Sequence, residues 1–98
     1  MIRIVKMIFK EELLPNFMEL FAEVQPKING FEGCKGVELL EDINDPCTLF
    51  TYSHWENEEA LNQYRDSELF KSVWSFTKAL FAAKPMAFSS KKIEEVKS

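Results

Sequence analysis

Few side chains in this sequence can take part directly in chemistry near neutral pH, and the first of them is its only histidine, His54. Imidazole changes charge at about pH 6.5, so His54 is a natural general base or hydrogen-bond donor. It follows Phe50 and Tyr52 in an alternating stretch, and all three share one strand face. If Trp55 faces the helices, His54 faces away from them. The alternative is a structural histidine at an interface or at the edge of a hairpin.

Two cysteines, Cys34 and Cys47, are the only thiols. They begin consecutive strands of a predicted antiparallel hairpin, which puts them on the order of 20 Å apart and excludes an intrachain disulfide. The same register places Cys34 roughly opposite His54 or Trp55, so a Cys–His site is conceivable, with a small buried cysteine as the alternative. The cysteines lack metal-ligand spacing, so we expect a reduced, cytoplasmic protein with no metal and no cofactor.

Aromatic side chains are abundant, with nine Phe, two Trp and two Tyr in 98 residues. Several could line a pocket that stacks a flat aromatic ligand, and the alternative is that they only form the core. Tyr64 and Arg65 could offer a phenol and a cation at the mouth of this pocket, or lie on a solvated helix face. The predicted pocket residues are Trp55, Trp74, Phe70, Phe21, Phe17 and Met7.

Composition narrows the class of protein. The net charge is −4 and no basic cluster stands out, which argues against binding of nucleic acid. No apolar run is long enough to cross a bilayer, and the first residues do not resemble a secretory signal. We therefore expect one small domain over residues 1–93, followed by a polar tail over residues 94–98.

The elements that must position these side chains follow from hydrophobic periodicity. Residues 2–9 predict a strand that is apolar on both faces, and residues 13–29 predict a helix ended by a left-handed stop at Asn29 and Gly30. Strands over residues 37–42 and 47–55 flank a turn at residues 43–46. Asn57 and either Asp66 or Ser67 begin two further helices, the second running to about residue 83, and residues 86–93 predict a weak last strand.

The order β-α-β-β-α-β predicts an α+β fold, the ferredoxin-like plait, with a four-stranded antiparallel sheet and both helices on one face. Apolar and aromatic residues nevertheless occur on both faces of the strands. A soluble monomer rarely exposes such a patch, so we expect a homodimer that packs sheet against sheet.

Two segments carry a resemblance to a known family: the residues around Phe31, Gly33, Cys34 and Gly36, and the run from Ser53 to Leu61 with the later Tyr64, Arg65, Ser67, Phe70 and Trp74. Over residues 2–88 the chain resembles the antibiotic biosynthesis monooxygenase family of dimeric α+β barrels. The resemblance implies the plait, the dimer and a pocket between helices and sheet. It also implies a cofactor-independent oxidation, in which a phenolate or enolate gives an electron to dioxygen in a dry pocket.

The resemblance transfers unevenly to individual residues. The family's tryptophan at the end of the third strand matches Trp55. Haem-degrading members use an asparagine and a histidine where this chain has Met7 and Trp74, so the proximal iron ligand is missing and haem degradation is disfavoured. The resemblance thus implies a monooxygenase for a small phenolic, quinol or polycyclic substrate, with His54 or Tyr64 assisting proton transfer. The alternative is a non-catalytic dimeric barrel that binds a small molecule.

Overall fold

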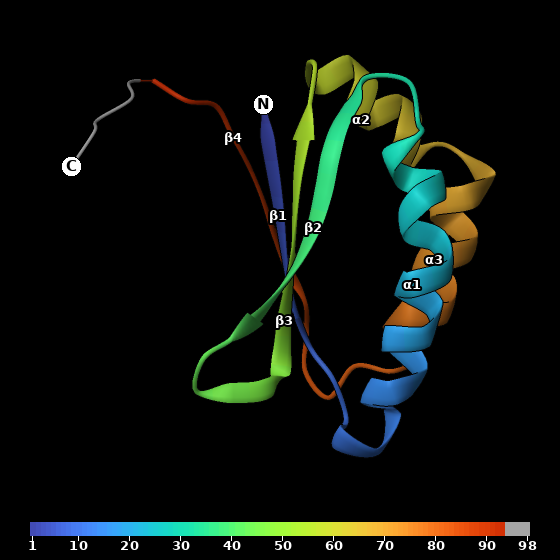
Figure 1. The fold of residues 1–98 in the computed structure, drawn as a ribbon, viewed down its shortest axis with the longest axis vertical. Helices are drawn as coiled ribbons and strands as arrows, with labels where there is room; N and C mark the ends of the chain where they lie inside the picture. Colours follow the sequence, from blue (N-terminus) through green and yellow to red (C-terminus); the bar gives the residue numbers. More distant parts are fainter. Residues whose placement is uncertain (94–98) are drawn as a thin grey trace.

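A computed structural model describes residues 1–93 and shows a four-stranded antiparallel sheet with helices on one face (Figure 1). In chain order the elements are β1 (Ile2–Ile8), the short 3-10 helix η1 (Glu11–Leu13), α1 (Leu14–Asn29), β2 (Cys34–Asp42), β3 (Asp45–Trp55), α2 (Glu58–Arg65), α3 (Glu68–Lys78) and β4 (Met86–Ser90). The predicted element order and the ferredoxin-like α+β fold are confirmed. The predicted polar tail lies outside the described residues.

The strands lie in the order β2-β3-β1-β4, so the first strand of the chain occupies an inner position. Val5 in the middle of β1 pairs with Thr51 of β3 on one side and with Ala87 of β4 on the other. This order follows when each β-α-β crossover returns over the same face of the sheet with the usual handedness. All helices therefore share one face, and the opposite face of this chain carries none (Figure 1).

The two faces of the sheet differ sharply in burial. On the helical side, Met7 and Trp55 keep only 3% and 1% of their surface exposed. On the opposite side, Met86 and Phe88 remain 52% and 50% exposed, although both are large and apolar. All five residues of β4 are exposed. Both faces of the sheet therefore carry apolar residues, but in this chain the helices cover only one of them.

Helix beginnings follow the sequence closely. The side chains of Asn57 and Ser67 accept hydrogen bonds from the backbone N–H groups of Ala60 and Phe70, at 2.8 and 3.1 Å. Each oxygen satisfies one of the free donors in the first turn of α2 or α3. The predicted N-cap Asn57 is confirmed, and of the two predicted starts of the next helix it is Ser67 that caps α3.

The end of α3 is a correction, since it stops at Lys78 and not near residue 83. The following residues instead join the end of β1. Phe81 forms an antiparallel bridge with Phe9, and the Ala82 N–H donates to the Ile8 carbonyl at 2.8 Å. Backbone pairing with the sheet thus replaces the last predicted helical turn. Similarly, β3 already begins at Asp45, which shortens the predicted turn, and β4 ends at Ser90.

The predicted left-handed stop after α1 is also wrong. Gly30 has φ −83°, and its N–H closes the helix by donating to the Pro26 carbonyl at 3.1 Å. The neighbouring Asn29 uses its side-chain oxygen to accept from the Val37 N–H of β2, at 3.1 Å. Positive φ occurs instead at Gly33, where a Cβ atom would lie 2.4 Å from that of Ala60. Glycine is therefore required where the chain enters β2 against α2.

Candidate functional site

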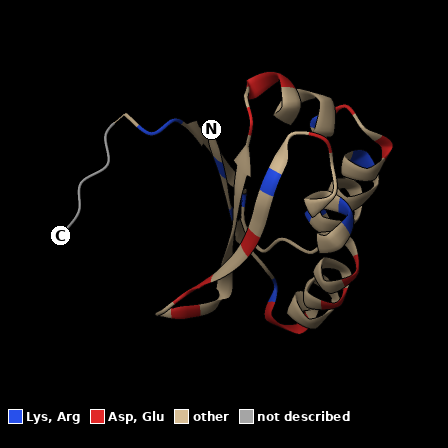
Figure 2. Cartoon of the chain, turned by 45° about the horizontal axis from the view of Figure 1, so that its top comes forward, with Lys and Arg blue, Asp and Glu red and all other residues tan. Residues whose placement is uncertain are grey.

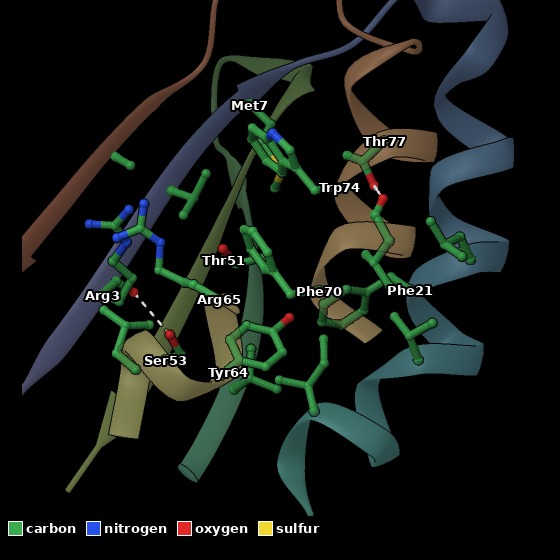
Figure 3. Close-up of a pocket in the computed structure, with 18 of the residues that line it drawn as sticks. Arg3, Met7, Phe21, Thr51, Ser53, Tyr64, Arg65, Phe70, Trp74 and Thr77 are labelled. Carbon is green, nitrogen blue, oxygen red and sulfur yellow. Dashed lines mark hydrogen bonds between the residues drawn. The ribbon is translucent and has the colours of Figure 1, made fainter. Parts of the chain in front are cut away.

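A cavity of about 360 Å³ lies between the helices and the sheet (Figure 3). Its volume falls in the lower part of the range typical of small-molecule sites, about 300–1,000 Å³. Every predicted pocket residue lines it, together with Tyr64. These residues are Met7, Phe17, Phe21, Trp55, Tyr64, Phe70 and Trp74. The structure thus brings together side chains from β1, α1, β3, α2 and α3.

Strand alternation supplies the floor of the cavity. Arg3, Val5 and Met7 of β1 share the helical face, as do Thr51, Ser53 and Trp55 of β3. Successive side chains of a strand point to opposite faces, so each set is made of every second residue. The floor changes along the strands, from the apolar Met7 to the polar Arg3 and Ser53.

Trp55 is held rigidly at one wall. Its indole N–H donates to the Ser53 hydroxyl at 2.9 Å, and its ring stacks on Tyr64 with centroids 5.1 Å apart. The Ser53 hydroxyl in turn donates to the Arg3 carbonyl at 3.3 Å (Figure 3). Because its only polar group is occupied, Trp55 contributes shape and stacking surface and no free donor.

Tyr64 offers a phenol to the cavity. The ring is 8% exposed and touches Phe70 edge-on at a centroid distance of 5.2 Å. No hydrogen bond joins its hydroxyl to another group within residues 1–93, and no fully buried polar side-chain atom in this range lacks a partner. The hydroxyl is therefore accessible from the cavity. Burial, with a smaller effect from Cys34, raises the pKa of Tyr64 to about 12, so the phenol stays protonated and acts as a donor.

A flat aromatic wall faces the sheet from α3. The rings of Phe70 and Trp74 lie nearly parallel, at an angle of 7° and a centroid distance of 6.1 Å. Thr77, one turn further on, uses its hydroxyl hydrogen to donate to the Val73 carbonyl at 2.7 Å. This side of the cavity therefore presents ring faces, and the Thr77 hydroxyl can offer only acceptor lone pairs (Figure 3).

Two cations complete the lining. Arg65 lines the cavity, and its side chain is also exposed to solvent. Arg3 was not among the predicted pocket residues, although alternation with Val5 and Met7 could have placed it there. No Asp, Glu or His lines the cavity within residues 1–93, so its fixed charge is positive in a protein of net charge −4.

His54 lies on the open face of the sheet, where its ring meets Tyr52 edge-on at 5.1 Å, and it does not line the cavity. Cys34 pairs with Trp55 and packs with the core on the helical side. The Cys–His site is therefore wrong, because thiol and imidazole face opposite sides of the sheet. Both cysteines are free. Cys34 of β2 pairs with Trp55, the last residue of β3, whereas Cys47 lies near the beginning of β3.

None of the helices in residues 1–93 combines the length and hydropathy that a membrane crossing requires. Over the same range, no three His, Cys, Asp or Glu side chains gather so that they could hold a metal ion.

Comparison with solved structures finds the same fold in several proteins. A conserved protein from Methanosarcina mazei is 24% identical, with a TM-score of 0.84 over 89% of this chain and 87% of that one. Rv0793 of Mycobacterium tuberculosis is 14% identical, with a TM-score of 0.88 over 98% and 97% of the two chains. A structure described as an antibiotic biosynthesis monooxygenase is 18% identical, with a TM-score of 0.87 over 96% and 100%.

Comparison with curated proteins gives no match. The family model described as antibiotic biosynthesis monooxygenase matches residues 1–73, from β1 into α3. The matched segment includes the polar and aromatic cavity residues from Arg3 to Phe70. By this match and its fold, the chain belongs to the antibiotic biosynthesis monooxygenase family.

Proposed function

We propose that this protein is a cofactor-independent monooxygenase for a small phenolic or quinol-type aromatic, with dioxygen as the second substrate. The observation that carries the proposal is the cavity itself: parallel ring faces from Phe70 and Trp74, a protonated phenol at Tyr64 and a positive fixed charge. Family membership supports the reaction class.

The chemistry needs little from the protein beyond binding and electrostatics. A bound phenolate transfers one electron to dioxygen, and the ring radical and superoxide combine at a ring carbon. Loss of water from this hydroperoxide then leaves one oxygen atom on the ring as a carbonyl group. The substrate supplies all four electrons, and the second oxygen atom leaves as water. In this proposal, Tyr64 donates a hydrogen bond to the oxygen that carries the charge.

Ionisation of the substrate is the step that the cavity must assist without a base. No carboxylate or imidazole from residues 1–93 lines it, and Tyr64 is protonated. The positive charge of Arg3 and Arg65 lowers the pKa of a nearby phenol, because an opposite charge favours the ionised form. We therefore propose that the substrate ionises by its own acidity, and the mechanism does not use His54.

The oligomeric state belongs to the same proposal. We infer that two chains pack the open faces of their sheets together, because large apolar residues are exposed there. Leu40 is 43% exposed and Phe88 50% exposed, on strands at opposite edges of the sheet. A symmetric dimer would cover both edges with one self-complementary contact. Light scattering at micromolar concentration should give twice 11.4 kDa, and the mass of one chain would contradict the dimer.

Oxygen uptake with a panel of 1-naphthol, anthrones and hydroquinones tests the catalytic proposal. We expect acceleration over buffer that is lost in Trp74→Ala and kept in Phe76→Ala, an α3 variant at a position that is 48% exposed and outside the cavity. Since no carboxylate or imidazole of residues 1–93 lines the cavity, a second function stays open, that of a binding module. Tight binding of these compounds without oxygen uptake would select that function.

A further inference from the structure

Two arginines from different elements meet at one end of the cavity. Arg3 projects from β1, and Arg65 is the last residue of α2; their side chains lie together in Figure 3. Burial, followed by the charge of Arg65, lowers the pKa of the Arg3 guanidinium below its usual value. The effect of Arg65 on Arg3 agrees with the close approach seen in the figure. Like charges repel, so this arrangement needs a reason.

Within residues 1–93, no carboxylate forms an ion pair with either arginine. Arg3 donates to the Ser89 hydroxyl at 2.8 Å, and Arg65 makes no side-chain hydrogen bond or ion pair to another group in residues 1–93. Acidic residues outnumber basic ones by sixteen to twelve in this chain, so potential partners are plentiful. Figure 2 shows them at the tip of the β2–β3 hairpin and along the helical layer. The cavity end is thus a place where two donors with fixed positive charge stay available.

The surroundings limit what such a pair can bind. Guanidinium groups present several N–H donors in a planar fork that matches an oxyanion such as a carboxylate. On the opposite side of the cavity lie the parallel rings of Phe70 and Trp74, which suit the face of an aromatic ring (Figure 3). A ligand that satisfies both ends is a flat aromatic with an anionic substituent at its rim.

We propose that Arg3 and Arg65 together bind a carboxylate on the aromatic substrate, so that the substrate class is a phenolic aryl carboxylic acid of one or two rings. The inference rests on the proposed function only in calling this ligand the substrate. Binding of the anion would relieve the repulsion between the two guanidiniums and hold the ring in one orientation. Orientation of this kind decides which ring carbon meets dioxygen.

Calorimetric titration with 2-naphthoate and its neutral amide, 2-naphthamide, tests the pair. The two probes share a ring and differ in charge, and neither is a phenol, so binding is measured apart from any oxidation. We expect the wild-type protein to bind the acid at least about tenfold more tightly, since hydrogen bonds to charged groups are the stronger ones. Arg65→Gln and Arg3→Gln should each remove most of this preference, and Arg3→Lys should keep part of it.

Lys71→Gln is the matched control, because Lys71 is an exposed cation of α3 outside the cavity, and it should keep the full preference. Equal affinities for acid and amide would overturn the proposal, as would failure of both probes to bind. A preference that survives both arginine substitutions would place the anion elsewhere and also overturn it. Oxygen uptake with 1-naphthol is measured independently of this titration. A protein without oxygen uptake could still prefer the acid to the amide, and a protein with oxygen uptake could show no such preference, so the two proposals can fail separately.

Discussion

Removing the phenol of Tyr64 should change how the stability of the protein depends on pH. Burial raises the pKa of this group from 10.0 to about 12. The unfolded chain therefore releases the Tyr64 proton more readily than the folded chain does. The resulting stabilisation is fully present below about pH 10, and it is lost as the pH rises from 10 toward 12.

The size of the effect follows from the shift of about two pKa units, each worth about 1.4 kcal/mol. Tyr64 should lower the free energy of unfolding by about 1.4 kcal/mol at pH 11, relative to pH 8, and by about 2.7 kcal/mol at still higher pH. Other groups titrate in this range, so the informative quantity is the difference between the protein and Tyr64→Phe.

Urea unfolding at about pH 8 and pH 11 measures this difference. We expect Tyr64→Phe to lose less stability between the two pH values than wild type does, by about 1.4 kcal/mol. Tyr52→Phe changes a tyrosine on the open face of the sheet and keeps Tyr64. The stability that this variant loses between the two pH values should be at least as large as the loss in wild type. An identical loss in wild type and Tyr64→Phe would refute the protonated, buried phenol that the mechanism uses as a donor.

Three further predictions concern the fold and the cavity. Gly33→Ala should lower the free energy of unfolding by about 2–4 kcal/mol, because φ is +83° and the new Cβ would lie 2.4 Å from that of Ala60. Gly30→Ala, at a position with φ −83°, should change the free energy of unfolding little. Urea unfolding measures both variants, and equal effects would contradict this prediction. Asn57→Ala should cost about 1 kcal/mol in the same assay through loss of the α2 N-cap, and an unchanged midpoint would contradict this role. Across a series of phenols, the pH at which oxygen uptake rises should shift with the pKa of the substrate. The same pH profile for every phenol would instead indicate that a base of the protein removes the proton, and it would contradict the proposed mechanism.

The fold was predictable because its signals are local. Apolar side chains recur along α1 at helical spacing, and Asn57 and Ser67 cap the next helices as their types suggest. The boundaries that failed depend on distant partners. α3 ends early because Phe81 pairs with Phe9 across most of the chain. Position 33 requires glycine because φ is positive there and because Ala60 occupies the space that a Cβ atom would take. Sequence periodicity contains no information on such contacts.

The cavity was predictable in its aromatic part and not in its charged part. Trp55 and Trp74 follow from the alternation along β3 and from the helical spacing of aromatic residues along α3. The pairing of Arg3 with Arg65 depends on how the end of α2 meets β1, and this is decided by the packing of the whole helical layer. His54 shows the converse: its side of the strand followed from alternation with Trp55, and that placement takes it away from the cavity.

The most direct test of the central claim is incorporation of isotopically labelled dioxygen into 1-naphthol or an anthrone, followed by mass spectrometry of the product. The account predicts one labelled oxygen atom per product molecule, formed faster than in buffer, with the acceleration lost in Trp74→Ala and retained in Phe76→Ala. Product formation no faster than in buffer, or equal acceleration by both variants, would contradict oxidation in this cavity.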